Sequence, residues 1–118
     1  MPNTYSWDDE PSPESLEFFE DRMREHTKVG ATSSHGANRY DLTLLDGRVV
    51  KVFLTDTYEF TVADYEELRA QHPEVDHIVS ASSWNHFTTA VEGVARGDEV
   101  GTYFIGEFMG ALHKKKRR

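Results

Sequence analysis

The chain of 118 residues contains no cysteine. It therefore offers no disulfide and no thiolate nucleophile, and could hold a metal ion only through carboxylate or histidine side chains. It also lacks any apolar run that approaches the roughly 20 residues of a membrane-spanning helix. Its first ten residues include Asp8, Asp9 and Glu10 and show neither the basic start nor the apolar core of a signal peptide. We therefore expect a cytoplasmic protein that does not associate with membranes.

Basic residues are scarce and unevenly placed. The sequence has 13 lysines and arginines against 21 aspartates and glutamates, which gives a net charge of −8. Five of the 13 basic residues end the chain: Lys114, Lys115, Lys116, Arg117 and Arg118. The remainder is acidic enough to repel phosphate backbones, so nucleic-acid binding by the folded part is disfavoured. The basic tail is the candidate nucleic-acid contact, although such a run is also typical of a disordered, solubilising end.

Length and composition indicate one small globular domain. With 37% hydrophobic and 29% charged residues, the chain can bury a single core. Its first residues are polar and acidic and contain proline and serine, a composition that favours disorder. We therefore expect a disordered acidic N-terminus at 1–13, one folded domain at 14–112 and a basic tail at 113–118.

Local signals predict an α/β (α+β) fold. Ser12 as N-cap and Pro13 at the first helical position begin an amphipathic helix. The Asp46-Gly47 pair is a strong hairpin-turn signal, and Thr61 with Asp64 forms a capping box. The expected elements are a helix from 13, strands at 28–33, 39–45 and 48–55, a helix from 62, a strand at 75–81, a helix at 88–96, a strand at 100–105 and a helix at 107–112. This order, α-β-β-β-α-β-α-β-α, indicates a mixed sheet of about five strands with flanking helices, in which the last two strands form a parallel crossover.

The hairpin at 39–55 carries the most informative residues. Asp41 opens its first strand, after a loop that contains Gly36. Lys51, Phe53 and Thr55 alternate along the second strand, so their side chains share one face.

The hairpin and the elements after it resemble the core of the restriction-endonuclease-like superfamily, the PD-(D/E)xK nucleases, and within it the Mrr-like type IV restriction enzymes. The resemblance extends over residues 16–112 and implies a three-layer core. It rests on four segments: His35-Gly36-Ala37-Asn38-Arg39-Tyr40-Asp41, Ile78-Val79-Ser80-Ala81-Ser82-Ser83-Trp84, Phe87-Thr88-Thr89-Ala90, and Tyr103-Phe104-Ile105-Gly106 with the residues up to Leu112.

The resemblance also implies a degenerate catalytic site. In such nucleases an Asp and an Asp or Glu hold a divalent cation, and a Lys positions water or neutralises charge. Asp41 matches the first position, but Phe53 and Thr55 stand at the acid and lysine positions. Lys51 could partly replace the lysine, and a carboxylate such as Glu66 could replace the acid, as could Asp56, Glu59 or Glu67. The catalytic candidates are therefore Asp41, Lys51 and Glu66; Asp41 is the candidate metal ligand, with Mg²⁺ implied only if the site is rebuilt.

These residues also have structural interpretations. Asp41 could be a solvated strand-edge residue or an ion-pair partner of Arg39, Arg48 or Lys51, and Phe53 is most simply a core residue. The six histidines include no pair at i, i+4 spacing, so a zinc site is not expected.

Three residues are candidates for an interface with another protein: Trp84, Phe108 and Met109. Aromatic and methionine side chains are enriched in interface cores. The favoured structural interpretation of Trp84, with Asn85 and His86, is a helix cap and a packing aromatic residue, and Phe108 with Met109 could close a turn on the core.

Two functions fit this sequence. The first is a catalytically inactive nuclease-fold protein that acts as a binding or assembly subunit in a DNA-processing or defence context, without a cofactor and with another protein or a second copy as partner. The second is a minimal Mg²⁺-dependent endonuclease with a relocated carboxylate. A third, an acidic mimic of nucleic acid, lacks an acidic stripe outside the first helix. The replaced catalytic positions favour the first function.

Overall fold

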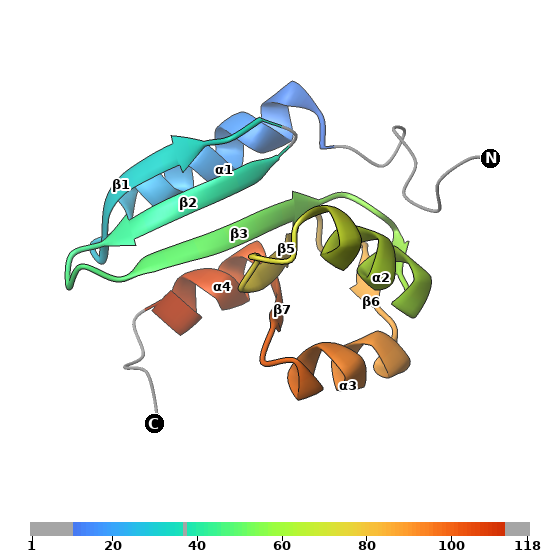
Figure 1. The fold of residues 1–118 in the computed structure, drawn as a ribbon. Helices are drawn as coiled ribbons and strands as arrows, with labels where there is room; N and C mark the ends of the chain where they lie inside the picture. The colour runs from blue at the N-terminus through green and yellow to red at the C-terminus, as the bar shows by residue number, and fades with distance from the viewer. Residues whose placement is uncertain (1–10, 37, 113–118) are drawn as a thin grey trace.

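The computed structural model of the protein describes residues 11–36 and 38–112 (Figure 1). Within these residues the elements are α1 (Pro13–Glu25), β1 (Val29–Ser34), β2 (Arg39–Leu44), β3 (Val49–Thr55), β4 (Glu59–Phe60), α2 (Val62–Gln71), β5 (His77–Ser80), β6 (His86–Phe87), α3 (Thr89–Gly97), β7 (Gly101–Phe104) and α4 (Ile105–Leu112). The order agrees with the predicted one except for β4 and β6. A strand of two residues has no alternation for a sequence pattern to detect.

The described part of the chain begins earlier than the predicted domain. Pro11 is buried, and α1 starts at Pro13. Ser12 caps this helix as predicted, because its side-chain oxygen accepts a hydrogen bond from the Ser15 N–H at 3.2 Å. Residues 1–10 of the predicted N-terminal segment and the predicted tail at 113–118 lie outside the described residues.

The main sheet has the strand order β1-β2-β3-β5-β7. β2 pairs antiparallel with β1 and β3, and β5 pairs parallel with β3 and β7, which confirms the predicted hairpin and crossover. At the hairpin turn, Gly47 takes a φ of +95°, a left-handed conformation that suits glycine. The resulting register places Asp41 opposite Lys51, and Arg39 opposite Phe53. β4 and β6 form a separate parallel pair.

Helices cover both faces of the main sheet, so the protein has three layers (Figure 1). The first core joins α1 and α4 to one face and contains Phe19, Met23, Tyr40, Leu42, Leu44, Val50, Val52, Leu54, Val79, Ile105, Phe108 and Leu112. The second core joins α2 and α3 to the other face and contains Phe53, Phe60, Tyr65, Leu68, Val75, Ile78, Val91, Ala95 and Val100. Because side chains alternate along β3, Phe53 enters the second core while its neighbours enter the first. Its interpretation as a core residue is confirmed.

α2 and α3 cover only part of their side of the sheet. The second core includes residues of β3 and β5, and none from β1 or β2 among the described residues. On this side, β1 and β2 present exposed or half-buried side chains: Ala31, Ser33, Asp41 and Thr43. We call this uncovered area, together with the facing Lys51 of β3, the open face.

No helix within the described residues has both the length and the apolar character needed to cross a membrane.

Gly101 offers a test of the packing at β7. A Cβ at this position would lie 2.6 Å from His77 Nδ1 and closer still to the Tyr103 ring. We expect Gly101→Ala to lower the free energy of unfolding by about 1–3 kcal/mol, the usual cost of overpacking. Gly93→Ala is the control, because a Cβ there meets nothing within 4 Å and alanine favours a helix over glycine by about 0.5–1 kcal/mol. Urea unfolding measures both variants, and a Gly101→Ala protein as stable as Gly93→Ala would contradict the described packing.

Candidate functional site

Charged side chains gather on the open face, at the place where the nuclease resemblance puts a catalytic centre. Lys51 Nζ lies 3.9 Å from Asp41 Oδ2, across the β2–β3 ladder. Arg39 Nη1 donates a hydrogen bond to Asp41 Oδ1 at 2.7 Å, and His35 Nε2 lies 3.1 Å from Asp41 Oδ2. The interpretation of Asp41 as an ion-pair partner of Arg39 and Lys51 is therefore confirmed.

Arg39 holds these charges together. Its side chain is only 6% exposed. Its Nε donates to Glu74 Oε2 at 2.9 Å, and its Nη1 donates to the carbonyl oxygen of Tyr40 at 2.6 Å as well as to Asp41. His72 Nδ1 lies 3.4 Å from the same oxygen of Glu74. Arg39 thus joins β2 to the segment between α2 and β5, and a buried guanidinium needs such partners because an unpaired buried charge is costly.

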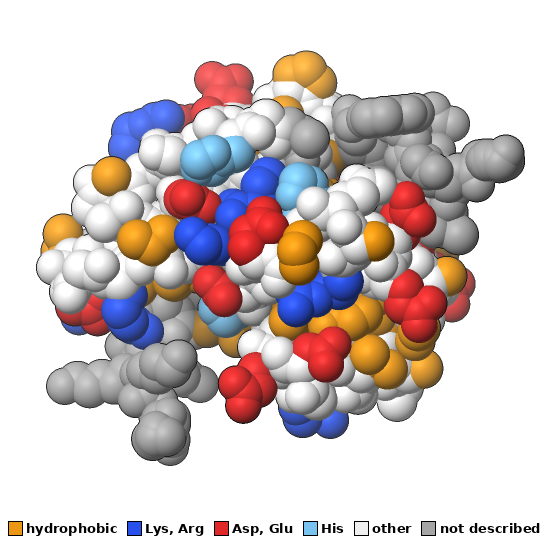
Figure 2. Space-filling model, viewed as in Figure 1, with side chains coloured by type: hydrophobic (Ala, Val, Ile, Leu, Met, Phe, Trp, Pro, Cys, Tyr) orange, Lys and Arg blue, Asp and Glu red, His pale blue; other side chains and the backbone are white. Residues whose placement is uncertain are grey.

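We call these six residues the charged cluster: His35, Arg39, Asp41, Lys51, His72 and Glu74. Figure 2 shows acidic, basic and histidine side chains side by side near the middle of this view, over the strands. The interleaved signs mean that the cluster is electrically balanced rather than a concentration of acids.

The electrostatics of the cluster keep its carboxylates ionised. Burial raises the pKa of the Asp41 carboxyl, but the hydrogen bond and charge of Arg39, with the charges of Lys51 and His35, outweigh that effect, so the pKa lies below its ordinary value of 3.8. Burial likewise raises the pKa of Glu74, but a backbone N–H and Arg39 lower it to a net value below the ordinary 4.5. Both carboxylates are therefore matched to cations at neutral pH.

Phe53 and Thr55, which stand where the resemblance implies an acid and a lysine, are both buried. Phe53 is 4% exposed, and its ring centroid lies 5.9 Å from that of His72. Thr55 is fully buried; its hydroxyl donates to Thr57 Oγ1 at 2.9 Å and accepts from the Thr57 N–H at 3.1 Å. These contacts give Phe53 and Thr55 a structural role in β3.

The carboxylates considered as replacements lie on other elements. Glu66 is exposed on α2. The other three have polar neighbours of their own. Gln71 Nε2 donates a hydrogen bond to Glu67 Oε2 at 2.8 Å, and Asn85 Nδ2 donates one to Asp56 Oδ1 at 2.8 Å. His86 Nε2 lies 4.0 Å from Glu59 Oε2. Within residues 11–36 and 38–112, no three His, Cys, Asp or Glu side chains are grouped in a way that could hold a metal ion.

A separate polar network lies at the carboxyl ends of β3 and β5, where open α/β sheets commonly bind ligands. Asn85 is 6% exposed, and its Nδ2 donates to Asp56 Oδ1 at 2.8 Å and to Ser80 Oγ at 3.2 Å. The His86 N–H donates to the Tyr58 carbonyl oxygen at 2.8 Å. These bonds tie the segment that follows β3 to the segment that follows β5.

The two tied segments carry exposed aromatic side chains. Trp84 is 80% exposed and Tyr58 is 64% exposed. The Tyr58 ring meets His86 edge-on, with centroids 5.3 Å apart. We call Tyr58, Trp84 and His86 the aromatic edge. The exposure of Trp84 contradicts the interpretation that it packs at a helix start, and its role at an interface stays a prediction.

The two other candidate interface residues, Phe108 and Met109, lie on α4. Phe108 is fully buried in the first core, with its ring centroid 6.4 Å from Phe19 and 5.7 Å from Tyr103. Its assignment as an interface residue is therefore corrected, because a side chain without exposed area cannot anchor a partner. Met109 is half-buried against the first core. Phe108 and Met109 instead pack α4 against the first core, as in the alternative interpretation, in which they close a turn on the core.

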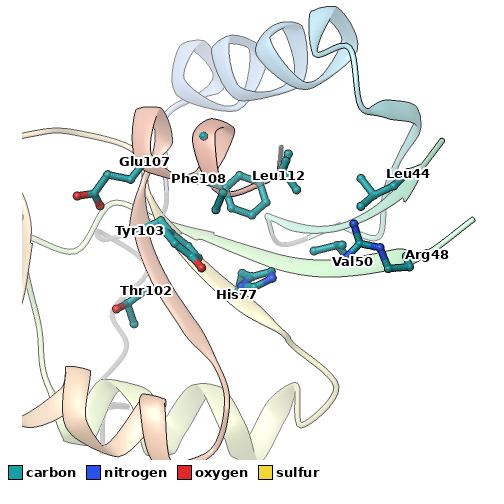
Figure 3. A pocket seen from close by; sticks show the side chains of 11 residues that line it. Leu44, Arg48, Val50, His77, Thr102, Tyr103, Glu107, Phe108 and Leu112 are labelled. Atoms are coloured by element: carbon teal, nitrogen blue, oxygen red, sulfur yellow. The ribbon is translucent and has the colours of Figure 1, made fainter. Parts of the chain in front are cut away.

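A groove of about 740 Å³ runs beside α4 (Figure 3). Its wall includes Val50, His77, Tyr103, Phe108 and Leu112, which come from β3, β5, β7 and α4. Arg48, a considered partner of Asp41, lies on this groove instead and donates to Asp46 Oδ2 at 2.9 Å. Sequence analysis missed the groove because segments far apart in the chain form it, and no local pattern marks such a surface.

Comparison of the chain with models of protein families, with curated proteins and with solved structures finds no match. The function must therefore be inferred from the charged cluster and the aromatic edge themselves.

Asp41→Asn tests whether the charged cluster stabilises the fold. Because the folded-state pKa of Asp41 is lowered, its ionised form stabilises the protein above the unfolded-state pKa of about 3.9, and this contribution is lost as the pH falls through the folded-state value. We expect Asp41→Asn to lower the free energy of unfolding at pH 7 by about 1.5 kcal/mol, the lower end of the range for a hydrogen bond to a charged group, because the Asp41 side chain is still 24% exposed. The difference from wild type should shrink as the pH approaches about 3.

Asp46→Asn is the matched control, because Asp46 pairs with Arg48 on the exposed hairpin turn and should matter less at either pH. Urea unfolding at the two pH values measures all three proteins. A loss in Asp41→Asn that is equally large at low pH would show that charge is not what Asp41 contributes.

Proposed function

We propose that the chain is a catalytically inactive protein with a restriction-endonuclease-like fold, which acts as a binding or assembly subunit in a DNA-processing or defence context. One observation carries this proposal: Asp41 is held by Arg39 and Lys51 and has no second carboxylate opposite it in β3. A divalent cation at Asp41 would add two positive charges beside a buried guanidinium. Coulomb repulsion would therefore oppose the metal that this class of nuclease requires.

The fold part of the proposal is supported by topology. A mixed five-stranded sheet contains an antiparallel hairpin followed by a parallel crossover, and helices pack on both of its faces. This arrangement agrees with the order that the resemblance implies. Phe53 and Thr55 stand at the two positions where a nuclease needs an acid and a lysine. Both side chains pack inside the protein, so the sheet can remain stable although the catalytic residues are replaced.

The binding part of the proposal rests on the aromatic edge. Trp84 and Tyr58 are exposed on segments that hydrogen bonds tie to each other, so binding through them would order little additional structure. Acidic Glu59 lies beside His86. We propose a protein partner that offers an apolar pocket to Trp84 and basic residues around it, because the net charge of −8 disfavours bare nucleic acid. Contact of the basic tail with nucleic acid stays a prediction.

The absence of nuclease activity can be tested with purified protein. With Mg²⁺ or Mn²⁺ present, we expect no cleavage of plasmid, linear or modified DNA, because a cation at Asp41 would face Arg39 and Lys51. Gel electrophoresis after long incubation measures cleavage. The alternative function, an endonuclease with a relocated carboxylate, would be established by cleavage that Asp41→Ala removes and Asp46→Ala preserves.

The aromatic edge can be tested by comparing Trp84→Ala with Val94→Ala. Val94 is an exposed apolar residue of α3, so its variant controls for the general loss of apolar surface. A protein captured from cell extract by wild type and Val94→Ala should be lost, or bound at least about tenfold more weakly, with Trp84→Ala, because central aromatic residues contribute at least about 2 kcal/mol to many interfaces. Quantitative mass spectrometry of the captured proteins measures this. Identical capture by all three proteins would contradict binding through the aromatic edge.

A further inference from the structure

The groove of about 740 Å³ beside α4 takes no part in the function proposed above (Figure 3). Its volume lies within the range of about 300–1,000 Å³ that is typical of small-molecule sites. α4 buries Ile105, Phe108 and Leu112 against the first core. It turns Gly110 and Ala111 toward the groove, and these two residues have little or no side chain. A Cβ at Gly110 would meet nothing within 4 Å, so the space beside α4 is open to a ligand.

Three aromatic rings in mutual contact form one wall of the groove. The ring centroid of His77 lies 5.4 Å from that of Tyr103 and 5.6 Å from that of Phe108, and the Tyr103 and Phe108 centroids are 5.7 Å apart. Val50 and Leu112 extend this wall with aliphatic side chains. Because the rings pack against one another, a ligand that lies on them would order little additional structure. The wall favours a ligand with an apolar body that contains a ring, since ring–ring contacts add to the gain from buried area.

The two charged residues of the groove lie at its opposite ends, Arg48 beside Val50 and Glu107 at the start of α4 (Figure 3). Glu107 Oε1 accepts a hydrogen bond from the Phe104 N–H at 3.1 Å. This is the bond that a glutamate makes in the first turn of a helix when it reaches back to the capping residue. In Figure 3 the Glu107 carboxylate points away from the rings. Glu107 therefore serves α4 and does not face a ligand on the aromatic wall.

Arg48 is held so that part of its guanidinium remains available. Asp46 Oδ1 accepts a hydrogen bond from the Arg48 N–H at 3.0 Å, and Asp46 Oδ2 accepts one from Arg48 Nε at 2.9 Å. Neither Nη atom of Arg48 has a hydrogen bond or ion pair within the part of the chain that the structure describes. The side chain is 40% exposed. Two available Nη atoms on a fixed guanidinium match the paired oxygens of a carboxylate or sulfonate, so this end of the groove favours an anionic group.

We propose that the groove binds a small organic anion, whose ring-containing apolar body lies against Tyr103 and His77 and whose carboxylate or sulfonate pairs with Arg48. The net charge of −8 opposes any anion at long range. At about 0.15 M salt the Debye length is about 8 Å, so distant carboxylates are largely screened and the contact with Arg48 decides. The proposal does not depend on the function proposed above.

Two dyes that differ in charge test the proposal on the full chain: the anion 1-anilinonaphthalene-8-sulfonate and its neutral parent N-phenyl-1-naphthylamine. At about 0.15 M salt, the anion should bind wild type saturably and shift the NMR amide signals of Val50, Thr102 and Ala111. In fluorescence titrations, Arg48→Gln should weaken binding of the anion at least about fivefold and that of the neutral dye less than about twofold. Arg24→Gln is the control, because it removes the cation of another exposed Arg–Asp pair, and it should bind both dyes like wild type.

A second pair of variants tests whether the dyes occupy the groove. Gly110→Leu places a side chain in the open space beside α4, so both dyes should bind at least about tenfold more weakly while the circular dichroism spectrum is kept. Gly93→Leu is the matched control, because a Cβ at this glycine of α3 also meets nothing within 4 Å, and it should bind like wild type. The Arg48→Gln comparison decides the proposal even if Gly110→Leu fails to fold.

Three results would overturn the proposal. The first is binding of the anion that Arg48→Gln leaves unchanged. The second is a set of amide shifts confined to the aromatic edge, which would place the dye there. The third is the absence of saturable binding of the anion below about 1 mM.

Discussion

The pairing of β2 with β3 about the Asp46-Gly47 turn decides where the most informative side chains of this protein lie. Because side chains alternate along a strand, a slip of one residue in this pairing would put Asp41 and Phe53 on opposite faces of the sheet, and would either turn Asp41 toward the first core or send Phe53 out of the second. In the observed register, Asp41 meets Lys51 on the open face. Arg39, two residues before Asp41 on the same face, can then reach both Asp41 and Glu74 from a buried position. The charged cluster is therefore a consequence of the hairpin register.

The neighbours of Asp41, more than Asp41 itself, decide which chemistry is possible on the open face. A metal-dependent nuclease needs an excess of carboxylates around its cation, so that the ion replaces repulsion with attraction. Here each carboxylate of the cluster already faces a cation, and the low pKa values of Asp41 and Glu74 express that balance. Our proposal is that the same ion pairs that make Asp41 a structural residue also oppose a metal ion beside it. The aromatic edge lies at the carboxyl ends of β3 and β5. In the function that we propose, this edge contacts a partner protein.

The parts of the fold that local sequence signals encode could be predicted. Ser12 and Thr61 cap their helices, and the hairpin turn and the parallel crossover form as expected, because each depends on residues close together in the chain. The link from Arg39 to Glu74 and the network around Asn85 join segments far apart in the chain, so no local pattern could reveal them. Phe108 and Trp84 are both isolated aromatic residues in the sequence, yet one is fully buried and the other exposed. The spacing of Ile105, Phe108 and Leu112 along one helical face was the signal that could have placed Phe108 in the core.

The claim that Asp41 belongs to a balanced ion-pair cluster, and does not bind a catalytic metal, can be tested most directly with Mn²⁺. This paramagnetic ion broadens NMR signals of nuclei near its binding site. If the cluster excludes a cation, amide signals of β2 and β3 around Asp41 and Lys51 will broaden no more on Mn²⁺ addition than those around exposed acids such as Glu66. Selective, saturable broadening at Asp41 and Lys51, reversed by Mg²⁺ and absent in Asp41→Asn, would contradict the claim.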